Sequence, residues 1–189
     1  FGAGGDLGVV KFGRFGSHPR VGGQPPRRFG QQQVGPQQFL AQGGHGSGVG
    51  ESMRSVVRQM GADGWLGIGW PEEYGGQGRS LIEQFIFFDE SMRAGAPVPM
   101  LTINSVAPTV MEYGTQEQKD FFLPKILRGE IHFCIGYSEP NAGTDLASLT
   151  TRADRDGDDY VINGQKVFTS LASDADYVWL ATRTNPDVK

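Results

Sequence analysis

Gly129-Glu-Ile-His-Phe-Cys-Ile-Gly-Tyr-Ser138 divides the 189-residue chain into a helical part and a strand-forming part. Before this stretch, apolar residues recur at three- and four-residue spacing, which is typical of amphipathic helices. Within it, residues 131–138 form a mostly apolar run between a glycine and the turn-forming Pro140, which predicts a strand. This change of period predicts a domain boundary near residue 130 and an α+β order of elements.

Two capping signatures mark helix starts on the N-terminal side of the boundary. Ser80 with Glu83, and Thr115 with Gln118, each pair a hydroxyl residue with Glu or Gln three residues later. Such pairs satisfy free amides in the first turn of a helix. The sequence therefore predicts helices over residues 51–60, 81–95, 100–113 and 116–128.

Two of these helices carry a further signal. Phe87 and Phe88 widen the apolar face of the second helix beyond one stripe, which predicts burial on more than one side. Pro108 lies inside the third helix, where its missing amide hydrogen predicts a kink or an offset.

Turn signals and short apolar runs alternate after Ser138. Asp156-Gly157 and Asn163-Gly164 are hairpin dipeptides. The strands predicted around them cover residues 148–153, 160–162, 166–170 and 177–182. We therefore expect a helical domain followed by the start of an antiparallel, barrel-like β-domain.

The first 50 residues differ in composition from the rest of the chain. They hold 15 of the 29 glycines and seven glutamines, with five basic residues and one acidic residue. Too few apolar side chains are present to offset the entropy of ordering such a segment. We expect residues 1–50 to be a low-complexity head, either disordered or translated from a shifted frame, ahead of a helical domain at 51–130 and a β-domain at 131–189.

Composition excludes several classes of protein. The net charge of −4 argues against a protein that binds a phosphate backbone. No run of about 18 apolar residues is present, so no membrane span is expected. Cys134 is the single cysteine, and the three histidines lack the spacing of a metal site.

Four motifs in order resemble one family. They are Trp70-Pro-Glu-Glu-Tyr-Gly-Gly76, Gly114-Thr-Gln-Glu-Gln-Lys119 with Phe122-Leu-Pro124, Ser138-Glu-Pro-Asn-Ala-Gly-Thr-Asp145, and Ile162-Asn-Gly-Gln-Lys166. In this order and spacing, residues 51–189 resemble the acyl-CoA dehydrogenases, and most closely their actinobacterial lipid- and steroid-degrading branch. The resemblance implies an N-terminal helical domain, a middle β-domain, a C-terminal helical bundle, FAD as cofactor and a tetrameric assembly.

The resemblance also implies a set of cofactor contacts at the end of the 131–138 strand. They are Ile135, Gly136, Tyr137, Ser138, Gly143, Thr144, Phe168, Thr169 and Ser170. Gly143 and Thr144 are expected to lie near the acyl-CoA as well. Small hydroxyls, glycine and an aromatic ring suit the polar edge and the flat face of a flavin.

Some of these positions depart from the family pattern. Many members have Trp where Phe168 stands, Thr where Ser138 and Ser170 stand, and Gly where Asn141 stands. Taken without the resemblance, Phe168 would be a core aromatic in a strand. Trp70 and Tyr74 are expected to pack only the helical domain.

In the family, a glutamate removes the α-proton of the acyl thioester while the β-hydrogen leaves as hydride. That glutamate belongs to the C-terminal bundle, so no catalytic residue is expected in this chain. Because the chain begins at Phe1 and ends at Lys189 without a closing element, we expect a fragment that lacks the bundle, is inactive alone and binds FAD weakly or not at all.

A fragment of this kind would leave apolar surface without cover, which predicts poor solubility. The aromatic residues expected to lose part of their cover are Phe85, Phe88, Phe121 and Phe122.

Other functions stay open at this stage. They are a non-catalytic subunit of a mixed tetramer, an acyl-CoA oxidase or flavin monooxygenase of the same fold, and a nucleic-acid-binding or scaffold protein acting through the head. Expected partners are the acyl-CoA substrate and an electron-accepting flavoprotein, in the bacterial cytoplasm or, in a eukaryote, the mitochondrial matrix.

Overall fold

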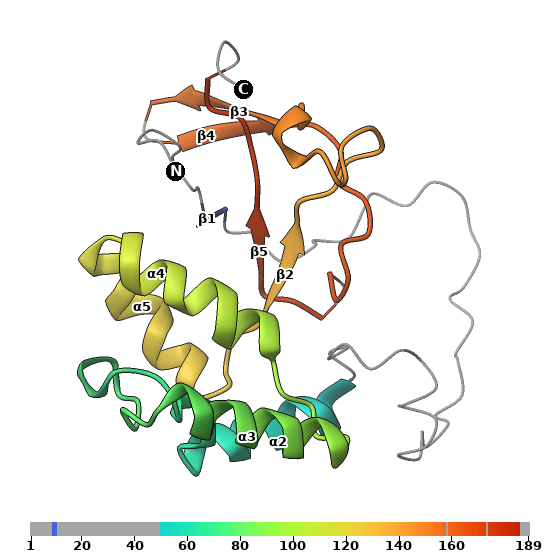
Figure 1. The fold of residues 1–189 in the computed structure, drawn as a ribbon. Helices are drawn as coiled ribbons and strands as arrows, with labels where there is room; N and C mark the ends of the chain where they lie inside the picture. Colours follow the sequence, from blue (N-terminus) through green and yellow to red (C-terminus); the bar gives the residue numbers. More distant parts are fainter. Residues whose placement is uncertain (1–8, 11–49, 158, 173, 186–189) are drawn as a thin grey trace, which may run out of the picture.

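The computed structural model describes residues 9–10, 50–157, 159–172 and 174–185. Apart from a two-residue strand at residues 9–10, helices come first and strands follow, so the α+β order is confirmed (Figure 1). Expectations about residues 1–50 lie outside the described residues, apart from a two-residue strand, β1 (Val9–Val10), and the first residue of α2. No helix in the described part is long and apolar enough to cross a membrane.

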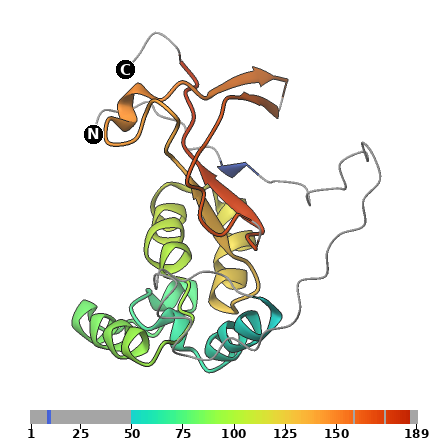
Figure 2. The same ribbon diagram turned by 90° about the vertical axis from the view of Figure 1, so that its right-hand side faces the viewer.

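The helices occupy one end of the molecule and the strands the other, as Figures 1 and 2 both show. The helical elements are α2 (Gly50–Ala62), η1 (Trp65–Gly67), η2 (Glu72–Tyr74), α3 (Leu81–Arg93), η3 (Thr102–Val106), α4 (Ala107–Tyr113) and α5 (Gln116–Leu127). A further short turn, η4 (Leu146–Ser148), lies among the strands.

Both predicted capping boxes are present. At α3, the Glu83 amide donates to the Ser80 hydroxyl (3.3 Å) and the Ser80 amide donates to the Glu83 carboxylate (2.9 Å). At α5, Gln118 and Thr115 make the same two contacts at 3.3 and 2.9 Å. Hydrogen bonds from the Ser80 amide and hydroxyl lower the pKa of Glu83 to about 2.

The predicted offset at Pro108 takes the form of a π-helical turn. In η3 the Ala107 amide donates to the Thr102 carbonyl, five residues back. This wider turn comes directly before Pro108, which lies at the start of α4. Proline has no amide hydrogen and crowds the preceding turn, so a widened turn accommodates it without breaking the helix.

The strands form two small sheets. In the first, β2 (Phe133–Gly136) pairs with β5 (Tyr177–Leu180), and β1 pairs antiparallel with the other edge of β5. In the second, β3 (Arg152–Asp156) and β4 (Asp159–Asn163) form the hairpin predicted around Asp156-Gly157.

Four details of the strand prediction are wrong. β2 and β5 run parallel, with Phe133 opposite Tyr177, rather than antiparallel. Residues 166–170 form no strand, because left-handed φ angles at Phe168 (55°) and Leu171 (71°) turn the backbone away from an extended path. Asn163-Gly164 is therefore not a hairpin turn. The strand predicted at 148–153 begins only at residue 152, after η4.

An aromatic cluster joins the helices to the sheet. The ring centroids of Phe122 on α5 and Phe133 on β2 are 5.7 Å apart, and Tyr177 on β5 lies 5.2 Å from Phe122. Trp179 packs edge-on against Phe133 at 6.5 Å. Since all four side chains are buried, the helical and strand parts share one core.

The prediction that α3 is buried on more than one side is wrong within this chain. Phe88 is buried, whereas Phe87 is half-buried and stacks on Trp65. The opposite face is exposed, and the exposed fractions are 79% for Leu81, 68% for Ile82, 66% for Phe85 and 54% for Ile86. Trp70 and Tyr74 pack into the helical core as expected.

Candidate functional site

Two segments far apart in the sequence meet at the end of β2. The Val167 amide donates to the Ser138 carbonyl (2.9 Å), and the Lys166 ammonium donates to the Tyr137 carbonyl (3.0 Å). These bonds place the loop after β2 beside the segment that carries Phe168. The sequence prediction expected both segments at one cofactor, and the structure brings them together.

A buried ion pair holds this junction. Lys166 Nζ lies 2.9 Å from Glu139 Oε1, and their side chains are 10% and 4% exposed. The other Glu139 oxygen accepts from the Thr150 amide (2.7 Å), and the Thr151 amide donates to Oε1 (2.8 Å). Burial alone would raise the pKa of Glu139, but hydrogen bonds from Thr151, Lys166 and Thr150 outweigh it, so this pKa lies well below its usual range. Glu139 is thus a structural anchor rather than an acid or base.

The Phe168 ring is uncovered. It is 88% exposed and follows directly on Val167, whose amide is bonded to Ser138. The expectation from local pattern alone, a core aromatic in a strand, is therefore wrong. A flat apolar ring held bare beside a polar loop is available to stack on a planar ligand.

An apolar cavity of about 320 Å³ opens next to this segment. Ser170 and Leu171 form part of its wall, together with Ile135 of β2. Much of the remaining wall comes from the helical part and is rich in Met and Pro: Met53, Met92, Pro97, Val98, Pro99, Met100 and Leu101. The cavity therefore lies between β2 and the helices, and two hydroxyl residues, Thr102 and Ser170, are among those that line it.

Gly143 and Thr144 lie exposed on the loop beyond Glu139. Paired backbone hydrogen bonds between Glu139 and Ala142, at 2.7 and 3.2 Å, close the turn that precedes them. A side chain at Gly143 would meet no atom within 4 Å, so its backbone is open to approach. No hydrogen bond in the described part of the chain links these two residues to residues 168–170.

Three of the remaining predicted contact residues already use one polar group in a hydrogen bond within the chain. The Tyr137 hydroxyl accepts from the Trp179 indole (3.0 Å), so this side chain packs towards β5. The Gly136 carbonyl accepts from the Ala181 amide (3.1 Å), and the Thr169 carbonyl accepts from the Ala172 amide (3.3 Å).

The sequence reasoning missed residues that build this site. The sequence prediction placed Lys166 in a motif and at the start of the strand expected at residues 166–170, and it did not pair this lysine with Glu139. Arg54 and Asp176, which join α2 to the start of β5, carried no signal in the sequence. The Met-rich wall of the cavity was also missed, because its residues come from three separate helical segments.

The family models for the acyl-CoA dehydrogenase N-terminal and middle domains match residues 25–130 and 134–189. The chain is 69% identical over 140 residues to acyl-CoA dehydrogenase FadE26 of Mycobacterium tuberculosis, covering 74% of this chain and 35% of that protein. It is 59% identical over 138 residues to FadE29 of the same organism, covering 73% and 36%. The chain thus spans about a third of the length of these curated relatives.

Solved structures agree with the sequence comparison. The steroid ACAD Tcur3481-Tcur3483 superimposes with a TM-score of 0.74 at 56% identity, covering 82% of this chain and 42% of that one. The ChsE4-ChsE5 complex from Mycobacterium tuberculosis gives 0.72 at 62% identity, covering 82% and 39%. Together with the family models, these likenesses show that the chain belongs to the acyl-CoA dehydrogenase family and is of the actinobacterial type.

Proposed function

We propose that the chain is the N-terminal and middle-domain part of an FAD-dependent enzyme that oxidises acyl-CoA thioesters to 2,3-enoyl-CoA. One observation carries the proposal: the exposed Phe168 ring and the apolar cavity share a single short segment. Phe168 and Ser170 are two residues apart, and Ser170 lies in the cavity wall. A planar cofactor on the ring would therefore lie beside an apolar acyl group in the cavity.

The residues present fit FAD. Phe168 offers a bare ring face of the kind that packs on an isoalloxazine. Ser170 on the same segment, and Ser138 on the segment bonded to it through the Val167 amide, offer hydroxyl donors. The open backbone at Gly143 and the exposed Thr144 suit a diphosphate, which needs close approach to amides. When bound, FAD supplies the acceptor for the hydride that leaves the β-carbon.

The lining of the cavity is suited to a bulky, apolar acyl group. Three methionines, Met53, Met92 and Met100, line it, and methionine adapts to irregular shapes better than branched side chains do. One relative is described as a steroid ACAD. We therefore propose a branched or polycyclic acyl substrate rather than a short linear one.

The catalytic base and the assembly involve protein beyond this chain. We propose that the base is a carboxylate in the remaining two thirds of the relatives' length. One relative is a complex of two different chains, ChsE4 and ChsE5, which favours a tetramer built with copies or a homologous chain. The expected electron acceptor is a second flavoprotein.

The test is to express the full-length protein that contains this chain and to measure bound flavin and its bleaching by acyl-CoA. Phe168→Ala should weaken flavin binding at least tenfold, and Ser170→Ala should slow bleaching about tenfold by removing one hydrogen bond of about 1.4 kcal/mol. Tyr113→Ala removes another exposed ring, 75% accessible at the end of α4, and is the matched control. Flavin content that Phe168→Ala leaves unchanged would overturn the proposal.

A further inference from the structure

Two residues between positions 166 and 172 have an unusual backbone conformation. Phe168 and Leu171 have φ angles of 55° and 71°, the left-handed region that non-glycine residues rarely adopt. Conformations of this kind persist only where the surrounding structure holds them. Because Leu171 and Ser170 line the cavity, whatever holds this segment also sets the shape of the cavity wall.

The N-terminal end of the segment is fixed within the strand part. Lys166 bonds the Glu139 carboxylate and the Tyr137 carbonyl, and Val167 bonds the Ser138 carbonyl. These contacts restrain residues 166 and 167. They do not reach the turn that begins at Leu171.

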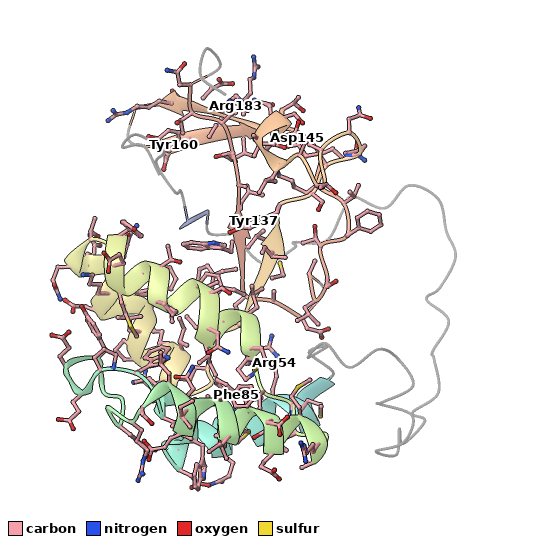
Figure 3. All side chains as sticks on the ribbon, in the orientation of Figure 1. Arg54, Phe85, Tyr137, Asp145, Tyr160 and Arg183 are labelled. Carbon is pink, nitrogen blue, oxygen red and sulfur yellow. The ribbon has the colours of Figure 1, made fainter. Side chains whose placement is uncertain are left out.

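At the C-terminal end, the Asp176 amide donates to the His132 carbonyl (2.9 Å), and Arg54 reaches this end from the helical part. Arg54 of α2 pairs with the Asp176 carboxylate (3.4 Å) and donates to the Asp174 carbonyl. The same Asp176 oxygen accepts from the His132 amide (2.9 Å), just before β2. Arg54, labelled in Figure 3, thus connects α2 to Asp174 and Asp176, which lie 120 and 122 positions later in the sequence.

Hydrogen bonds carry this restraint back to the cavity. The amides of Asp174 and Ala175 both donate to the Leu171 carbonyl, each at 2.9 Å. A fixed Asp174 therefore fixes Leu171, whose side chain is in the wall. The Arg54 side chain is 25% exposed and lines the cavity itself, so water only partly screens its contacts.

We propose that Arg54 is a positioning residue, which holds the Ser170–Leu171 wall of the cavity in place from the helical domain through Asp174 and Asp176. The importance of this wall for flavin and acyl binding rests on the proposed function. The restraint itself depends only on contacts within the chain.

The experiment measures amide hydrogen exchange in the 189-residue chain without flavin or acyl-CoA. Arg54→Met keeps the length of the side chain but removes its charge and donors. It should speed exchange at least tenfold in peptides covering residues 171–177, and leave the β3–β4 hairpin unchanged. Arg93→Met is the matched control, since it removes an exposed ion pair with Asp89 on α3.

Two further measurements distinguish an electrostatic restraint by Arg54 from simple side-chain packing: a lysine variant and the effect of salt. Arg54→Lys keeps a cation that can reach Asp176 but lacks the second donor arm, so it should restore part of the protection. Added salt should speed exchange at 171–177 in the parent chain and have no such effect in Arg54→Met. Exchange that is equal in Arg54→Met and Arg93→Met, or equal in the Lys and Met variants, would overturn the proposal. Because no cofactor is present, the result does not depend on whether the full-length protein binds FAD.

Discussion

At the scale of single residues, Lys166 and Glu139 show how a buried charge can be tolerated. Their side chains are 10% and 4% exposed, and the carboxylate also accepts from the Thr150 and Thr151 amides. Removing the cation alone leaves Glu139 buried without its counter-ion. Lys166→Met should therefore lower the free energy of unfolding by about 3–5 kcal/mol, measured by urea denaturation at neutral pH.

The depressed pKa of Glu139 gives this pair a pH signature. A carboxyl whose pKa is lowered by folding contributes stability above its unfolded pKa, about 4.3, and the contribution is lost as the pH falls through the folded value. Lys166→Met should raise the pH at which acid unfolding begins. Glu139→Gln with Lys166→Met removes both charges and should recover part of the loss. A change below about 0.5 kcal/mol in Lys166→Met would show that the pair does not act as described.

At the scale of elements, local signals were predictable and long-range ones were not. The caps at Ser80 and Thr115 were found because both partners lie within three residues. The path of residues 166–170 was missed because contacts to Ser138 and Glu139, nearly 30 residues earlier, fix residues 166 and 167, and Phe168 then adopts a left-handed φ that no local pattern indicates. The parallel pairing of β2 with β5 depends on contacts across 44 residues, such as Phe133 with Tyr177, for which a hairpin signal gives no guidance.

Thr115 allows the cap on α5 to be measured. Thr115→Ala removes the hydroxyl that accepts from the Gln118 amide and should cost about 1 kcal/mol of unfolding free energy in thermal or urea denaturation. Thr109→Ala is the matched control. Its hydroxyl donates to the Ser105 carbonyl inside the helix, a contact that contributes little to helix stability. Equal losses in the two variants would argue against a specific role for the cap.

At the scale of the whole molecule, one face of α3 is left exposed by the residues that the structure describes. Phe85 and Phe121, expected to lose cover, are 66% and 41% exposed, whereas Phe88 and Phe122, also expected to lose it, are buried at 8% each. The aromatic core around Phe122 therefore keeps its cover within this chain, and the apolar side chains that lack cover lie on the surface. Leu81, Ile82, Phe85 and Ile86 form one contiguous stripe, since residues three and four apart lie on the same side of a helix.

A stripe of this size favours association of the isolated chain in water. Light scattering over a range of concentrations should show an average mass that rises well above the 20.5 kDa of one chain. Ile82→Glu with Phe85→Glu should reduce this rise, because burying two carboxylates against a second apolar stripe is unfavourable. Tyr113→Glu alters an exposed ring outside the stripe and should leave it unchanged. A parent chain that stays monomeric throughout would mean that the stripe is too polar at its margins to drive association.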